Sequence, residues 1–221
     1  MPCNLTRLTA VALMCFFLVG PAVAGPLPTD PNAMPGFQGQ QLFSSTANGF
    51  TMTATVEFAV YAPGMVETSA ALGNPGFAMD PSLGANWVYA YEVFNTSPAI
   101  GGAVITASTV GLNIGPIPGS ASISNYAFGG GVAPTLSHFA GTTSASWSFG
   151  PLNIGANSDI LFFTMPYSPT YRPGGVQGGH GTIDSHPLPS PTPEPATITL
   201  LASALLLIGG HRCWRRRCCL R

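Results

Sequence analysis

The chain has 221 residues, a formal net charge of −1 and 7% charged residues, with no lysine. Five of its seven basic residues lie at or after Arg212, and between Gly25 and Ser190 the sole arginine, Arg172, stands against seven acidic residues, a net charge of −6. This acidic, charge-poor region excludes nucleic-acid binding, which requires a basic surface against the phosphates.

Residues 1–24 have the pattern of a signal peptide. An apolar run over residues 8–19 has the length of a signal core, and small residues follow it at the −3 and −1 positions. We therefore expect export by the general secretion machinery and cleavage by signal peptidase. The residues that define this cleavage site are Ala22, Ala24 and Gly25, with the cut after Ala24.

The exported region contains no cysteine, because two cysteines precede residue 25 and the other three are Cys213, Cys218 and Cys219. A disulfide framework and a thiolate metal site are therefore excluded there. Roughly 165 residues suffice for one domain with an ordinary apolar core.

Residues 41–166 have the periodicity of β-strands. Apolar and polar residues alternate from Phe50 to Tyr61 and from Trp87 to Phe94, as in half-buried antiparallel strands. Glycine and proline turn signals separate these runs from others over 104–110, 145–149 and 159–165. We expect an all-β domain, an antiparallel β-sandwich of jelly-roll or immunoglobulin-like type, preceded by an extended segment over 25–40.

Residues 167–192 are rich in glycine and proline. Five prolines fall between His186 and Pro195. Proline-rich segments favour extended, semi-rigid spacers. The composition thus predicts a linker that holds the domain away from the C-terminal tail.

Residues 193–221 combine three features in a fixed order. Pro193, Glu194 and Pro195 come first, an uncharged apolar span comes next, and the end is basic through Arg212, Arg215, Arg216 and Arg217. We expect a transmembrane helix over about 196–211, with the arginines in the cytoplasm and the body of the protein exported. About 15 apolar residues are fewer than the roughly 20 that cross a bilayer comfortably, which fits a transient anchor.

This three-part tail, on a protein with a signal peptide, resembles the PEP-CTERM sorting signal. The resemblance covers about 30 residues. It implies recognition by an exosortase, a membrane-embedded cysteine transpeptidase-like enzyme, with processing near Pro193-Glu194-Pro195. The family is associated with bacteria that make extracellular polysaccharide and an outer membrane, which implies a final location at the cell surface or outside the cell.

The strongest candidate for metal binding is a glycine-rich segment with two histidines and an aspartate, namely His180, Asp184 and His186. Imidazole and carboxylate are good ligands for divalent metals. The glycines around them offer no rigid scaffold, however, and the segment adjoins the proline-rich stretch. We therefore expect a solvated flexible loop, and neither a metal site nor a cofactor.

Candidate catalytic groups are equally sparse. Ser137 and His138 are neighbours, and neighbours on a strand point to opposite faces. A glycosidase pair, which needs two carboxyl groups roughly 5–10 Å apart, has candidates in Glu57, Glu67 and Glu92. Any β domain with seven acids offers such a pair, so we expect no enzymatic activity.

The sequence thus favours a non-enzymatic structural protein of the bacterial surface or extracellular matrix, sorted by exosortase. The alternative is a carbohydrate-binding or adhesive module for exopolysaccharide, with a stacking platform built from Trp87, Tyr89 and Tyr91. Aromatic residues at strand spacing are more often part of a core than of a platform. Their exposure in the structure therefore distinguishes the two hypotheses.

Overall fold

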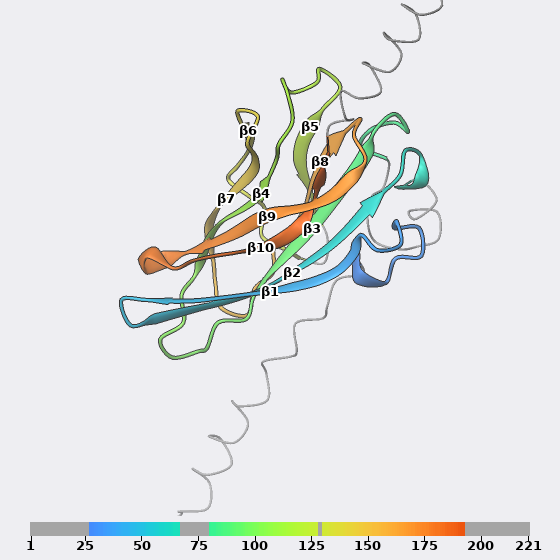
Figure 1. Ribbon diagram of the computed structural model, residues 1–221. Helices are drawn as coiled ribbons and strands as arrows, with labels where there is room; N and C mark the ends of the chain where they lie inside the picture. The colour runs from blue at the N-terminus through green and yellow to red at the C-terminus, as the bar shows by residue number, and fades with distance from the viewer. Residues whose placement is uncertain (1–26, 67–79, 128–129, 193–221) are drawn as a thin grey trace, which may run out of the picture.

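The computed structural model describes residues 27–66, 80–127 and 130–192 (Figure 1). Within these ranges the chain forms two antiparallel five-stranded sheets, which confirms the predicted all-β class. The expected signal peptide and sorting tail lie outside the described residues. In the described part of the chain, no helix combines the length and the apolar character needed to cross a bilayer.

The first sheet has the order β1-β2-β3-β8-β5 and the second the order β10-β9-β4-β7-β6. The strands of the first sheet are β1 (Gln38–Ala47), β2 (Phe50–Tyr61), β3 (Trp87–Asn95), β8 (Ile160–Met165) and β5 (Ser122–Tyr126). Those of the second are β10 (Ile183–Pro191), β9 (Pro169–Gly178), β4 (Ile105–Gly111), β7 (Ser144–Leu152) and β6 (Leu136–Ala140). Two short 3-10 helices are η2 (Leu27–Thr29) and η3 (Gly179–Gly181).

The main core contains side chains from both sheets. The predicted alternation of β2 is confirmed on this face, where Met52, Ala54, Val56, Phe58 and Val60 are all buried. They share the core with side chains of the second sheet that include Val110, Trp147, Val176 and Leu188. Burial of these apolar faces against each other drives the two sheets to pack as layers.

A second core covers the other face of the first sheet. Its members on the strands are Ala59, Tyr61, Val88, Ala90, Ile160 and Phe162. Leu27 of η2, Ala33 and Val66 pack over them. β3 is therefore buried on both faces almost throughout, although its alternation predicts one exposed face. The segment expected to be extended over 25–40 instead includes η2, turns and the start of β1.

The structure corrects the predicted linker over 167–192, because these residues form the β9–β10 hairpin of the second sheet. Three prolines of β10, Pro187, Pro189 and Pro191, occupy alternate positions. Pro187 and Pro191 face Pro173 and Pro169, so neither pair has an N–H to donate, and the ladder hydrogen bonds fall on the pairs between them. Because β10 is an edge strand, prolines at this spacing are compatible with the sheet.

The glycines of the segment have a packing role. A Cβ atom on Gly174 of β9 would lie 2.5 Å from Cδ1 of Leu188 and 3.0 Å from the carbonyl oxygen of Thr109. Only glycine therefore allows the buried Leu188 to lie over β9. The glycine content of this segment predicts flexibility, whereas in the structure Gly174 lets β9 and β10 approach each other closely.

Candidate functional site: the last strand and its junction with the sorting motif

β10 lies between β9 and the edge of the other sheet. Figure 1 shows β1 and β10 side by side, so that the edge strands of the two sheets meet along one side of the domain. We call the contact between β1 and β10 the seam. β10 is the last strand before the expected sorting motif. Its contacts therefore decide how firmly that motif is attached to the folded domain.

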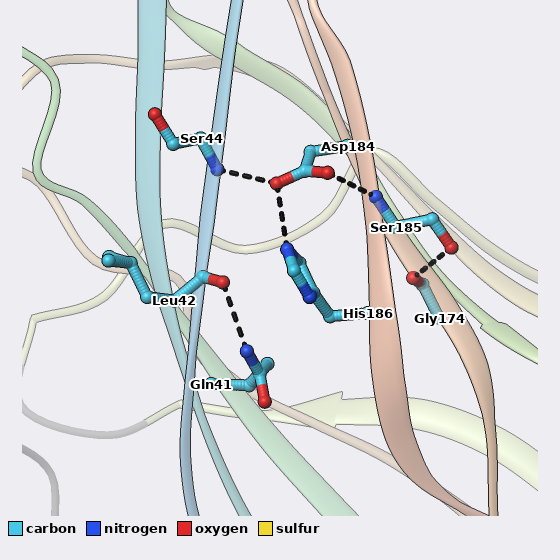
Figure 2. Close-up of polar contacts among 7 residues, drawn as sticks. All are labelled: Gln41, Leu42, Ser44, Gly174, Asp184, Ser185 and His186. Atoms are coloured by element: carbon cyan, nitrogen blue, oxygen red, sulfur yellow. Dashed lines mark hydrogen bonds and ion pairs between the residues drawn. The ribbon is translucent and has the colours of Figure 1, made fainter.

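Asp184 bridges the seam (Figure 2). The backbone N–H of Ser44 in β1 donates to Asp184 Oδ2 at 2.6 Å, and the N–H of Ser185 donates to Oδ1 at 2.8 Å. His186 Nε2 lies 3.1 Å from the same Oδ2, and its ring meets Phe43 edge-on, with centroids 5.2 Å apart. One carboxylate thus joins both sheets.

These contacts favour the charged form of Asp184. Partial burial acts to raise the pKa of the carboxyl, but the N–H groups of Ser44 and Ser185 and the ring of His186 outweigh it, and the net pKa is lowered. At neutral pH the seam therefore contains a carboxylate that accepts charge-assisted hydrogen bonds.

The turn of the β9–β10 hairpin packs on the β1–β2 hairpin. Asn48 Nδ2 donates to the carbonyl oxygen of His180 at 2.9 Å, and the His180 ring stacks on Phe50 with centroids 3.6 Å apart. The segment expected to be a flexible loop is thus a packed turn. In the described ranges, no three His, Cys, Asp or Glu side chains gather closely enough to hold a metal ion.

The end of β10 is fixed by four contacts. Leu188 is buried in the main core, and Tyr91 Oη donates to the carbonyl oxygen of Pro189. Ser190 Oγ donates to the carbonyl oxygen of Gly111 at 2.6 Å. Finally, the N–H of Thr192 donates to the carbonyl oxygen of Ser168 at 2.9 Å. The fold therefore extends to the residue directly before Pro193.

The proposed aromatic platform is absent from the surface. Tyr89 and Tyr91 are 0% and 1% exposed, and Trp87 is partly buried against the same core. The Tyr89 ring stacks on Phe163 with centroids 4.7 Å apart. Burial raises the pKa of both tyrosine hydroxyls. These residues belong to the core.

The candidate catalytic groups are apart or buried. Ser137 and His138 are neighbours on β6, and within the described chain no hydrogen bond joins them. Glu57 and Glu92 are directly opposite each other on β2 and β3 and are both 2% exposed, whereas Glu67 lies outside the described residues. Sequence reasoning identified these two acids but not their burial, since it missed the second core.

The buried carboxyl of Glu92 has a raised pKa. Burial raises its pKa to about 7, although Asn157 Nδ2, which donates to Glu92 Oε1 at 2.8 Å, lowers it, and the charge of Asp159 raises it further. Glu57 and Glu92 face each other across the strand pair, and burial in the sheet shields both carboxyl groups from a substrate.

Comparison with known protein families decides the nature of the segment after β10. Residues 191–217 match the family model of the PEP-CTERM protein-sorting motif. The chain carries a PEP-CTERM motif. This confirms the resemblance, and it implies that exosortase targets the chain to the cell surface or the extracellular space. No curated protein and no solved structure matches the chain significantly.

The matched range begins inside the fold. Pro191 is both the last residue of β10 and the first residue of the PEP-CTERM match. The spacer predicted between domain and motif is therefore missing. A signal for this was present in the sequence, because prolines at every second position, with Leu188 and Ser190 between them, have the period of a strand.

Proposed function

We propose that this chain is a non-enzymatic structural protein of a bacterial surface or extracellular matrix, delivered there by exosortase. The observation that carries the proposal is the PEP-CTERM match at 191–217, joined without a spacer to a two-sheet β domain. The domain offers a rigid, charge-poor body, and the motif supplies its destination.

Delivery in this proposal has three steps. The chain is exported, and signal peptidase cuts after Ala24. The apolar span over about 196–211 then holds it in the membrane, with the C-terminal arginines in the cytoplasm. Exosortase next processes the chain near Pro193-Glu194-Pro195, which removes the basic end and releases an acidic domain without cysteine.

The absence of enzymatic activity is part of the proposal. Its support is that Glu57 and Glu92 are buried in the sheet, where a substrate has no access, and that Ser137 and His138 form no nucleophile–base pair. The adhesive alternative has less support, because Tyr89 and Tyr91 pack in the core and leave no row of exposed rings for stacking on sugars.

Mass spectrometry of the surface-located protein, from cells with and without exosortase, tests the delivery. We expect a mature C-terminus close to residues 193–195 in the presence of the enzyme and an intact tail in its absence. A variant with alanine at Pro193, Glu194 and Pro195 should accumulate as the intact precursor. Retention of the residues after Pro195 in the surface form of the wild type would refute the proposal.

Binding of the mature protein to exopolysaccharide from the same cells tests its role. A structural protein should co-fractionate with the matrix without saturable binding to the isolated polysaccharide. Saturable binding that a soluble oligosaccharide competes away would instead establish the adhesive alternative.

A further inference from the structure

Pro193-Glu194-Pro195 follows the last strand of the sheet after a single intervening residue. β10 ends at Pro191, Thr192 is bonded to Ser168, and Pro193 comes directly after it. A fully extended residue spans about 3.5 Å, so Thr192 alone separates the end of β10 from Pro193-Glu194-Pro195 by roughly that length. The residues before the motif are also buried, since Ser190 is 0% exposed.

Processing of a peptide bond requires access to the chain on both sides of it. Sites of cleavage are favoured where backbone is exposed and free of hydrogen bonds. Here the backbone just before the motif is paired with β9, and Ser190 and Pro189 are bonded to other elements as well. An enzyme therefore cannot enclose residues 189–192 while they remain in the sheet.

The end of β10 is buried, and a small set of bonds holds it in place. Pro189 and Pro191 lie outside the bonded pairs of the ladder, so residues 189–192 are held by the pairing of Ser190 with Thr170, by the bond from Thr192 to Ser168 and by the bonds from Tyr91 and Ser190 to other elements. Leu188 in the core and the Asp184 seam anchor the rest of the strand. Local opening of the end can thus occur without unfolding of the domain.

We propose that residues 189–192 leave the sheet before the motif is processed, and that Tyr91 and Ser190 are positioning residues that control this opening. The inference rests on the proposed processing by exosortase. When opening and closing are fast, the rate of cleavage follows the population of the open form. Loss of one hydrogen bond, about 1 kcal/mol, should raise that population about fivefold.

Tyr91→Phe is the most informative variant, because Tyr91 is buried in the domain and the substitution changes no residue next to Pro193-Glu194-Pro195. It removes the hydroxyl that donates to Pro189. Tyr61→Phe is the matched control, since it removes a buried hydroxyl that donates to Asp30 in the second core, away from β10. In pulse-chase experiments on the full chain in cells with exosortase, Tyr91→Phe should be processed about fivefold faster than wild type, and Tyr61→Phe at the wild-type rate.

A second variant tests the same inference without any loss of stability. Insertion of Gly-Ser-Gly-Ser between Thr192 and Pro193 places a flexible linker between the sheet and Pro193-Glu194-Pro195. It should raise the processing rate at least fivefold. The same insertion between Gly115 and Pro116, in an open loop, is the control and should not change it.

The outcomes separate this inference from the proposed function. Faster processing of both Tyr91→Phe and the Thr192 insertion, relative to a processed wild type, supports the inference. A processed wild type whose rate neither variant raises overturns the inference and leaves the proposed function intact. If no variant is processed by exosortase, the proposed function fails and the inference fails with it.

Discussion

Replacement of Leu188 by alanine tests whether the last strand contributes to the fold or is the spacer that its composition predicted. Leu188 is 0% exposed, lies in the core between the sheets and covers Gly174. Truncation of a buried leucine loses the transfer free energy of its carbon atoms and leaves a cavity, which together cost about 2–5 kcal/mol. We expect Leu188→Ala to lower the free energy of unfolding by about 3 kcal/mol.

Urea unfolding followed by the fluorescence of the buried Trp147 measures this loss. With a slope of about 2 kcal/mol/M, the midpoint should fall by about 1.5 M. Ile183→Ala is the matched control, because Ile183 belongs to the same strand but is 62% exposed, and its loss should cost less than about 0.5 kcal/mol. Equal, negligible effects of the two substitutions would refute the packing of β10 and would support the predicted linker over residues 167–192.

Three further predictions address other contacts. The folded pKa of Glu92 is about 7 and its ordinary value is 4.5, so the contribution of Glu92 to stability should be lost as pH rises between these values. Glu92→Gln keeps an acceptor for Asn157 and removes this titration; thermal melts should show the variant equal to wild type at pH 4 and about 3 kcal/mol more stable at pH 8. Gly174→Ala should destabilise the protein by about 1–3 kcal/mol, because its Cβ collides with Leu188, and a parallel Gly115→Ala, in open space, should be near neutral in the same urea assay. Asp184→Asn should lower the melting temperature at pH 7. Because the folded pKa of Asp184 lies below its ordinary value of 3.8, this difference should begin to shrink near that value and disappear as pH falls through the lowered pKa; a difference that stays constant down to pH 2 would contradict the role of its charge.

Much of the first sheet was predictable from local pattern. The alternation of β2 identified Met52, Val56 and Val60 as core residues, because a strand with one buried face repeats every second residue. The same rule misjudged Glu57 and Glu92. Their faces are covered by segments distant in the chain, which include Leu27 and Ala33, and no local period reveals such a cover.

The candidate site shows the same division. The tail was recognisable from Pro193-Glu194-Pro195 and the arginines, since a sorting signal is read by other machinery as linear sequence. The seam between β1 and β10 was not recognisable from the sequence, because the bond from Ser44 to Asp184 joins residues 140 positions apart. Proline and glycine in β9 and β10 acquire their structural roles from neighbours across the sheet.

The sequence by itself thus determined the all-β class, the acidic and cysteine-free body, and the address carried by residues 191–217, because composition, period and linear motifs are local properties. Only the tertiary structure decided where the folded domain ends. The ladder with β9, the burial of Leu188 and the bond from Thr192 to Ser168 extend the sheet to the edge of the motif. The physical reason is that strand pairing and side-chain packing depend on residues far away in the chain, which composition does not record.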